Sequence, residues 1–319
     1  MVTGEPAPTS PGGPSSPRVD VGAQPPRGSG GKRLSVVVAA HNEAAVLGRT
    51  LRTLLATAAP AEFEVVVVAN GCTDATAAVA RSVSGVTVLE LPEPGKPAAL
   101  NAGDAVVATF PRIYLDADIP LPTAGARALA AAVTAPGVLA AAPRRRLDTT
   151  GRPLLVRGYY AINRRHPAYR NALFGRGAIA LSAAGRDRFG PFPDVVADDL
   201  FLDTQFTEAE KREVAEVSTV VATPRRTADL LRRLGRVRAG NASLRAADDQ
   251  VRRARRASWL VDVVLPRPWL LPAGVCYAGL TLLAATAARR PAVRNRWGRD
   301  ESSRVPGPAD ADGVPGATP

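Results

Sequence analysis

Four short apolar segments, each followed by a segment of different pattern, constrain the fold of this chain most strongly. They cover residues 34–40, 64–70, 86–91 and 113–118, and valine dominates the first two. Apolar runs without alternation are typical of strands buried on both faces, as in a parallel sheet covered by helices. Helical patterns follow the first three: from Glu43 to about Ala58, from near Thr73, and after Lys96. Because βαβ crossovers are right-handed, we expect a doubly wound α/β domain with a mostly parallel sheet.

Polar side chains follow each predicted strand. In such a sheet, ligands bind beyond the carboxyl ends of the strands, so we expect these side chains to share one rim. In chain order they are His41, Asn42 and Glu43; Asn70, Gly71 and Asp74; Glu93, Gly95 and Lys96; Asp116 and Asp118.

The fourth strand ends in two carboxylates, Asp116 and Asp118, one residue apart. Two carboxylates so close repel each other unless a positive charge lies between them. A cation and a lysine among several carboxylates suit a metal-bound diphosphate.

In their order and spacing, LSVVVAAHNEAAVLGRTL, VVVVANGCTDATAAVA, GKPAALNAG and YLDAD resemble the GT-A glycosyltransferases of family 2. The resemblance covers roughly residues 34–241 and implies the GT-A (Rossmann-like) fold. It also implies an inverting glycosyltransferase of the hexosyltransferase class, which takes its sugar from a nucleotide-diphosphate sugar.

The resemblance implies a nucleotide-binding set. Asp74 would read the base, and Lys96 would approach the nucleotide. The remaining members line the pocket or end the strands around it: Ala40, His41, Glu43, Asn70 and Asp116. Simpler interpretations stay open. Asp74 could cap the helix that follows it, and Glu43 could lie in a first helical turn, where its charge interacts favourably with the helix dipole. Lys96 could be a solvated surface lysine.

Asp116 and Asp118 match the DxD motif of the family, in which the second carboxylate holds Mg²⁺ or Mn²⁺ on the diphosphate. Hard cations prefer carboxylate and phosphate oxygens. Such a metal would stabilise charge on the leaving nucleoside diphosphate.

The second half resembles the acceptor side of the family. Residues 171–182 match its glycine-containing acceptor segment, and Asp198–Asp199 match its ED motif, which makes Asp199 the catalytic base with Asp198 beside it. Inversion requires a carboxylate that deprotonates the acceptor hydroxyl. The simpler alternative is a pair of acids at a helix N-terminus.

The chain departs from the processive members of the family. Their QxxRW motif corresponds here to Arg233-Leu-Gly-Arg236-Val237, which keeps only the arginine. We therefore predict a non-processive enzyme. Arg236 and its neighbours are expected to bind the diphosphate or an anionic acceptor, with an exposed basic helix face as the alternative.

Composition divides the chain into four parts. Residues 1–32 and 298–319 are rich in Pro and Gly and are expected to be disordered. Residues 33–245 are expected to form the catalytic domain, and residues 246–297 a basic and apolar helical segment.

The formal charge of +12 fits nucleic acid, an anionic membrane surface or phosphate-bearing substrates. The basic stretches lack the aromatic residues of single-strand binders, so we expect no nucleic-acid partner. Two cysteines and two histidines are too few for a metal cluster of those ligands. Without a visible signal peptide, the chemistry is expected on the cytoplasmic side.

Residues 269–288 carry no charge, and arginines flank them. This length is sufficient to span a bilayer, and residues 258–266 are also apolar. We predict membrane contact through residues 258–290 at the cytoplasmic face, which fits a lipid-linked acceptor. A cytoplasmic enzyme with a soluble carbohydrate acceptor is the alternative.

Two rival classes also fit a DxD strand end. An aspartyl phosphotransferase or phosphatase would place the motif after its first strand, and a nucleotidyltransferase would follow that strand with a glycine-rich loop. A non-catalytic nucleotide-sugar-binding scaffold is a third class, and the complete acidic set argues against it.

Overall fold

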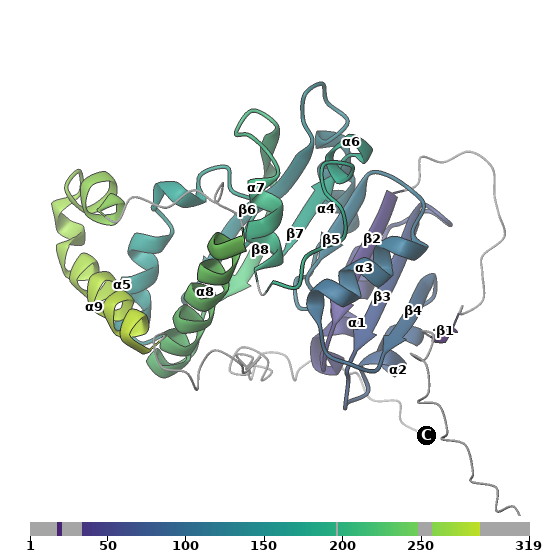
Figure 1. Cartoon of the computed structure of the whole chain (residues 1–319), viewed down its shortest axis with the longest axis horizontal. Coiled ribbons are helices and arrows are strands. Elements are labelled where there is room, and N and C mark those ends of the chain that lie inside the picture. The colour runs from purple at the N-terminus through teal and green to yellow at the C-terminus, as the bar shows by residue number, and fades with distance from the viewer. Residues whose placement is uncertain (1–17, 21–33, 196, 248–256, 288–319) are drawn as a thin grey trace, which may run out of the picture.

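The structure, a computed structural model, describes residues 18–20, 34–195, 197–247 and 257–287. Within these ranges a sheet of eight strands runs through the molecule in the order β1-β4-β3-β2-β5-β7-β6-β8 (Figure 1). Its strands are β1 (Arg18–Asp20), β2 (Leu34–Ala40), β3 (Phe63–Asn70), β4 (Val86–Leu91), β5 (Arg112–Leu115), β6 (Ala140–Asp148), β7 (Ala178–Leu181) and β8 (Lys211–Ala222).

Helices connect the strands and cover the sheet. The α-helices are α1 (Ala44–Leu55), α2 (Thr76–Arg81), α3 (Lys96–Val106), α4 (Thr123–Ala132), α5 (Leu154–Asn163), α6 (Ala183–Arg186), α7 (Asp198–Thr204), α8 (Thr227–Ala247) and α9 (Leu271–Ala287). Short 3₁₀ or π turns are η1 (Pro167–Tyr169), η2 (Trp259–Val264) and η3 (Pro268–Leu270).

The four predicted strands form the parallel part of the sheet, as expected. β4, β3, β2 and β5 run parallel, with Val36 opposite both Val65 and Ile113. Val36, Val37 and Val38 are fully buried, because one face of these strands packs on α1, α2 and α4 and the other on α3 and α7. The carboxyl ends of these strands therefore meet at one rim of the sheet.

The remaining strands make the other half of the sheet mixed. β7 runs antiparallel to both β5 and β6, and β8 pairs parallel with β6. This arrangement brings the β7 segment next to the strand that ends in Asp116, so the second half of the chain reaches the same rim.

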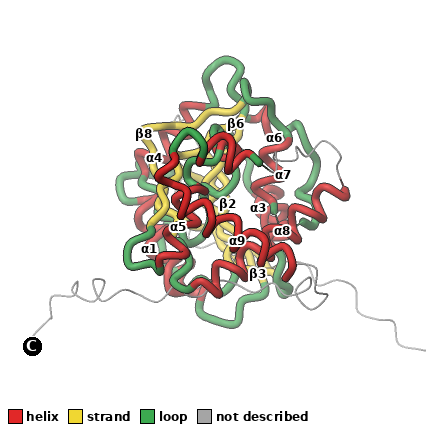
Figure 2. Tube along the Cα trace, turned by 90° about the vertical axis from the view of Figure 1, so that its left-hand side faces the viewer, coloured by secondary structure: helices red, strands yellow, loops and turns green. Residues whose placement is uncertain are grey.

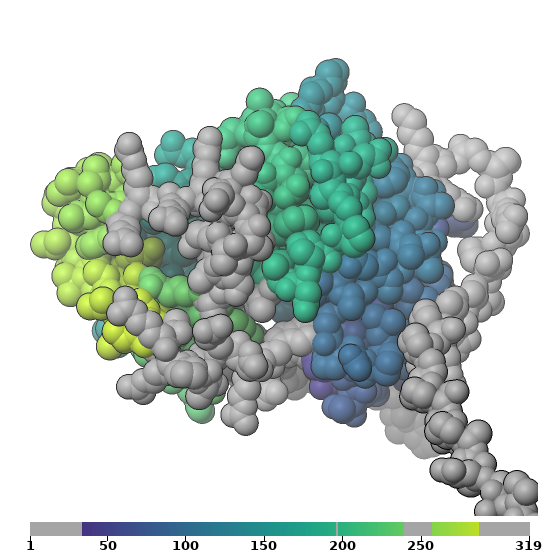
Figure 3. Space-filling model, in the orientation of Figure 1, coloured from purple at the N-terminus to yellow at the C-terminus, as the bar shows by residue number. Residues whose placement is uncertain are grey.

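Three helices lie at one end of the molecule, beyond β6 and β8. Figure 1 and the end-on view of Figure 2 place α5 and α9 together there, and α8 joins them through Leu230, which packs with Tyr160 and Leu280. In Figure 3 this end is the yellow-green surface, opposite the blue surface of the parallel strands. The predicted boundary at residue 245 falls inside α8, which packs with the helices of the predicted C-terminal segment.

One short strand lies inside the predicted N-terminal tail. Residues 18–20 form β1, which pairs antiparallel with β4, so the expectation of disorder over residues 1–32 is wrong there. The backbone of an edge strand offers unpaired N–H and C=O groups, and such an edge binds a short segment without needing apolar side chains. The rest of that tail, and residues 298–319, lie outside the described residues.

Candidate active site

Lys96 is the centre of a charged cluster at the rim. It is the first residue of α3, and its Nζ lies 2.9 Å from Asp116 Oδ1 and 3.0 Å from Asp198 Oδ2. Asp116 follows β5 and Asp198 begins α7. The cluster therefore joins the third and fourth predicted strand ends to the predicted acceptor half, across 102 residues of sequence between Lys96 and Asp198.

The electrostatics of this cluster depend on burial. The Asp198 side chain is 13% exposed, and burial raises its pKa to about 6. Lys96 opposes that increase, while Asp199 and Asp116 add to it. For Lys96, burial alone would lower the pKa, but the three carboxylates outweigh it and raise the pKa well above its ordinary value. Lys96 is therefore a permanent cation at neutral pH.

Asp118 lies on a tight turn directly after β5. The turn is closed by a hydrogen bond from Ile119 N to Asp116 O at 3.1 Å, and Asp116 N donates to Gly177 O at 2.8 Å. The side chain of Asp118 is exposed at the rim. The pair of predicted DxD carboxylates thus divides, with Asp116 paired to Lys96 and Asp118 directed to the open side.

The carboxylate of Asp199, the predicted base, accepts two backbone hydrogen bonds. Gly175 N donates to Asp199 Oδ2 at 2.7 Å, and Leu200 N donates to Oδ1 at 2.8 Å. These bonds fix the orientation of the carboxylate beside Asp198. Asp198 and Asp199 also lie in the first turn of α7, as the helix-terminus interpretation expected.

Asp74 connects the two loops of the predicted nucleotide pocket. It accepts hydrogen bonds from Ala44 N at 3.2 Å and from Thr76 N at 3.0 Å, at the starts of α1 and α2. Burial raises the pKa of Asp74, whereas hydrogen bonds from the Thr76 hydroxyl and from the backbone of Thr76 and Ala44 lower it, and the net result is a lowered pKa. The capping interpretation is thus present in the structure, on an exposed side chain that is also accessible to a base.

The other predicted pocket residues hold the loops after β2 and β3 together. Asn70 is buried, and its amide donates to Ala40 O at 2.8 Å and accepts from Gly95 N at 3.0 Å. His41 Nδ1 lies 2.5 Å from Asn70 O, and Glu43 is buried with its N–H bonded to Thr76 Oγ1. Asn70 therefore positions the backbone around the pocket.

Arg236 lies on α8, which packs against α5 and α9. The cluster around Lys96 is built from α3, α7 and the end of β5. The predicted contact of Arg236 with the nucleotide stays a prediction.

The carboxylates at the rim fit a divalent metal that arrives with its substrate. Among the described residues no group of three or more His, Cys, Asp or Glu side chains forms a metal cage. Mg²⁺-type sites commonly use one or two carboxylates and take their other ligands from phosphates and water. Asp118, exposed on its turn beside Asp116, supplies that kind of donor set.

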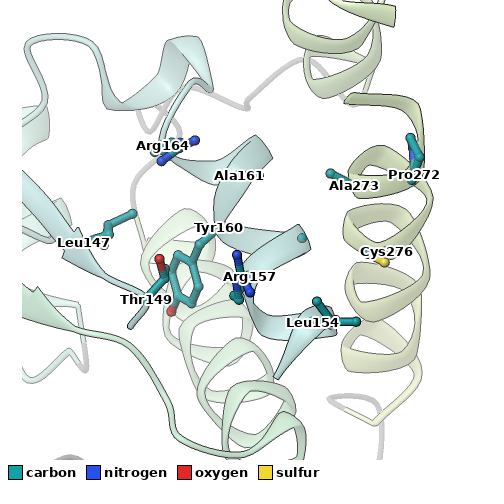
Figure 4. Close-up of a pocket in the computed structure, with 11 residues that line it drawn as sticks. Leu147, Thr149, Leu154, Arg157, Tyr160, Ala161, Arg164, Pro272, Ala273 and Cys276 are labelled. Atoms are coloured by element: carbon teal, nitrogen blue, oxygen red, sulfur yellow. The ribbon is translucent and has the colours of Figure 1, made fainter. Parts of the chain in front are cut away.

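A hollow lies away from this rim, between α5 and α9 (Figure 4). Its volume is about 450 Å³, and both Cys276 and Ala273 of α9 line it opposite α5. Arg157 and Arg164 add two positive charges to a lining that is otherwise mostly apolar. Among the described residues no carboxylate lines it, so its size is no argument for catalysis.

Two residues near Asp199 were not singled out by the sequence. Gly175 contributes its backbone N–H, which any residue type would provide, and Arg145 of β6 lies beside Gly175. The run Arg144-Arg145-Arg146 was the available signal, but the sequence alone does not show which of the three faces the rim.

Comparisons with known proteins identify the fold and the family of the domain. The model of glycosyl transferase family 2 matches residues 35–181. The mannosyltransferase PcManGT from Pyrobaculum calidifontis, solved with GDP-Man and Mn²⁺, has a TM-score of 0.54 at 24% identity over 83% of each chain. Glucosyl-3-phosphoglycerate synthase from Mycobacterium tuberculosis has a TM-score of 0.49 at 19% identity, over 71% of this chain and 82% of that one. The comparison with curated proteins found no match.

The sheet and the family match define a glycosyltransferase of the GT-A fold, the class that takes its sugar from a nucleotide. Within that class, residues 35–181 form a domain that matches glycosyl transferase family 2. The family match favours this class over the phosphotransferase, nucleotidyltransferase and scaffold alternatives.

Proposed function

We propose that this glycosyltransferase is inverting, metal-dependent and non-processive, and that it transfers one sugar from a nucleotide-diphosphate donor to an acceptor. The observation that carries the proposal is the cluster in which Lys96 joins Asp116 to Asp198, with Asp118 and Asp199 as its neighbours. One cation thus links the donor side of the rim to the acceptor side.

On the donor side, Asp118 would hold Mg²⁺ or Mn²⁺ on the diphosphate. A divalent cation there stabilises the charge of the leaving nucleoside diphosphate. Lys96 adds a fixed positive charge beside that group, and Asp74 contacts the base in the pocket bordered by Ala40, His41, Glu43 and Asn70. Arg236 binds the diphosphate from α8.

On the acceptor side, Asp199 accepts the proton of the attacking hydroxyl. The bond between that oxygen and the anomeric carbon forms as the bond from the same carbon to the diphosphate breaks, and attack from the opposite face inverts the configuration. The hydrogen bonds from Gly175 N and Leu200 N keep Asp199 oriented for this transfer.

The donor half is tested by calorimetric binding of UDP, GDP and their sugar conjugates, with and without Mn²⁺. We expect one nucleotide to bind in a metal-dependent way, and Asp118→Ala to weaken that binding at least about tenfold, because a metal ligand is lost. Asp187→Ala, at the end of α6, removes an exposed carboxylate elsewhere and serves as the matched control. Metal-independent binding unchanged in Asp118→Ala would contradict the metal role.

The base is tested by Asp199→Asn, which keeps the shape of the side chain and one of its two acceptor oxygens. We expect the transfer rate to fall about a hundredfold or more, since general-base catalysis contributes about 10²–10⁴-fold, while donor binding stays at the wild-type level. Full transfer activity in this variant would remove Asp199 from the base role.

For the acceptor we propose a lipid-linked molecule at the cytoplasmic face of the membrane. Residues 268–286 form the one stretch among the described residues that is long and apolar enough to cross a membrane, with a mean hydropathy of 1.5 and 22% of it buried. Large apolar side chains on it are exposed, among them Trp269 at 72% and Val275 at 66%. The hollow beside α9, with Arg157 and Arg164, would suit a lipid chain with an anionic head group.

A further inference from the structure

Arg145 is a half-buried arginine that pairs with no carboxylate among the described residues. Its Nη2 donates to Asn163 Oδ1 at 3.0 Å, and its guanidinium lies 3.9 Å from the centre of the Tyr169 ring. Both partners are neutral. A guanidinium carries five N–H donors, so most of them remain for another ligand.

The neighbouring arginine, Arg176, is paired with a carboxylate, so the arginines of this region do not all lack one. Arg176 is 3% exposed and bonds to Glu213 through Nη1 at 2.5 Å, to Pro143 O at 2.8 Å and to Tyr169 O at 2.9 Å. Its charge is balanced within the protein. Arg145 beside it has no such balance, and burial lowers its pKa, with Arg176 contributing to that decrease while Tyr169 opposes it.

Arg145 lies next to Gly175, the residue whose backbone holds the predicted base. A side-chain carbon placed on Gly175 would be 3.6 Å from Arg145 Nη1, and the N–H of Gly175 holds Asp199 Oδ2 at 2.7 Å. Gly175 thus lies between an unbalanced cation and the carboxylate that receives the acceptor proton. An anionic acceptor that approaches Asp199 also meets Asp198, and the nearby cation Lys96 is already paired with Asp116 and Asp198, so a further cation favours its binding.

We propose that Arg145 binds a phosphate group of the acceptor, and so selects acceptors that carry one. The planar guanidinium fork matches phosphate oxygens and makes charge-assisted hydrogen bonds with them. The Tyr169 ring and Asn163 hold the fork in place. The inference rests on the proposed function, because it assigns Asp199 to the acceptor side.

The experiment uses the full chain saturated with the nucleoside diphosphate and Mg²⁺, so that phosphate probes cannot occupy the donor site. Calorimetry measures the dissociation constants of glycerol 3-phosphate and of glycerol, its neutral counterpart. We expect binding of the phosphate only, weakened about tenfold or more by Arg145→Gln and in part restored by Arg145→Lys.

Arg146→Gln is the matched control, because it removes the same charge from the adjacent, exposed position of β6. We expect it to leave the dissociation constant within about twofold of wild type, since long-range effects of exposed charges are screened by salt. Equal weakening by Arg145→Gln and Arg146→Gln would overturn the proposal, because it would indicate general attraction.

A second arm separates the two sources of a phosphate. Phosphatidylcholine vesicles that contain phosphatidic acid present the same glycerol phosphate on a lipid. Vesicles of phosphatidylcholine alone are the comparison. Dependence on Arg145 in the soluble arm indicates a free phosphorylated acceptor, and dependence only in the vesicle arm indicates a lipid phosphate. Absence of dependence in both arms overturns the proposal. Metal-dependent nucleotide binding, measured on the same samples, reports separately on the proposed function.

Discussion

Asp198 and Asp199 are adjacent in the chain, yet their carboxylates have different partners. Asp198 is paired with the cation Lys96, whereas Asp199 is held by two backbone N–H groups. At the scale of single residues, this division separates a carboxylate that is ion-paired with Lys96 from one that is held by backbone N–H groups and forms no close ion pair among the described residues. The second is the more suitable proton acceptor for an acceptor hydroxyl.

The raised pKa of Asp198 predicts a pH-dependent stability. Aspartate in an unfolded chain titrates near pH 3.9, and folded Asp198 titrates at about pH 6. Between these values the folded state binds the extra proton, so the free energy of unfolding contributed by this group falls as pH rises from about 4 to about 6. The fall is on the order of 2 kcal/mol.

Urea unfolding of wild type and Asp198→Asn across pH 4–7 in a chelating buffer measures this contribution. We expect the wild-type curve to lose more stability than the Asn curve over that window, because the amide does not titrate. Parallel curves for the two proteins would contradict the assignment.

The sequence predicted the individual acids better than their partners. Asp116, Asp118 and Lys96 follow strands whose apolar runs are plain, so their common rim followed from sheet topology. The backbone bond from Gly175 and the position of Arg145 depend on how β6 and β7 pair across the sheet, and no local pattern encodes that pairing.

At the scale of elements, the turn that carries Asp118 is packed against a single glycine. Gly177 has φ +75°, and a side-chain carbon there would lie 2.4 Å from Ile119 Cγ1. Ile119 is the residue directly after Asp118, and Gly177 O accepts the hydrogen bond from Asp116 N. The close contact therefore fixes the position of this turn relative to the start of β7.

Gly177→Ala is expected to weaken Mn²⁺-dependent nucleotide binding at least about tenfold, because Ile119 and the turn must shift away from the new methyl group. The positive φ adds strain of roughly 1–2 kcal/mol for any other residue. Gly137→Ala is the matched control, with φ +77° and nothing within 4 Å of the new carbon. Equal effects of the two substitutions on nucleotide binding would mean that strain alone, and not the turn, is responsible.

The elements themselves were predictable where burial is two-sided. The valine runs of β2 and β3 are buried over nearly their whole length, which produces the continuous apolar pattern. β8 alternates between buried and exposed positions and carries several charges, and β6 changes from four alanine and proline positions to three arginines. Such strands owe their place to neighbours distant in sequence, so the mixed half of the sheet was not predicted.

At the scale of the whole molecule, the charged rim and the apolar helices occupy separate regions. The parallel strands and the Lys96 cluster form one part, and α5, α8 and α9 form the end beyond β8 (Figures 1 and 2). The packed side of α9 buries Leu280 and Ala284, while Val275, Leu282 and Leu283 remain exposed. An apolar face of this kind, away from the charged rim, is typical of an interaction surface rather than of a core.

We expect the full chain to sediment with anionic vesicles, and Val275→Glu with Leu282→Glu to reduce the bound fraction about tenfold or more. These side chains are 66% and 67% exposed, so the charges are compatible with folding but not with burial in a bilayer. Val220→Glu, on β8 and 54% exposed, adds one charge away from α9 and is expected to leave vesicle binding unchanged. Nucleotide binding by all variants at the wild-type level would show that the catalytic domain is intact. Neutral vesicles lack the electrostatic attraction, so weaker sedimentation of the wild type with them would assign part of the affinity to the basic residues. Equal sedimentation of the double variant and the wild type with anionic vesicles would rule out α9 as the membrane contact.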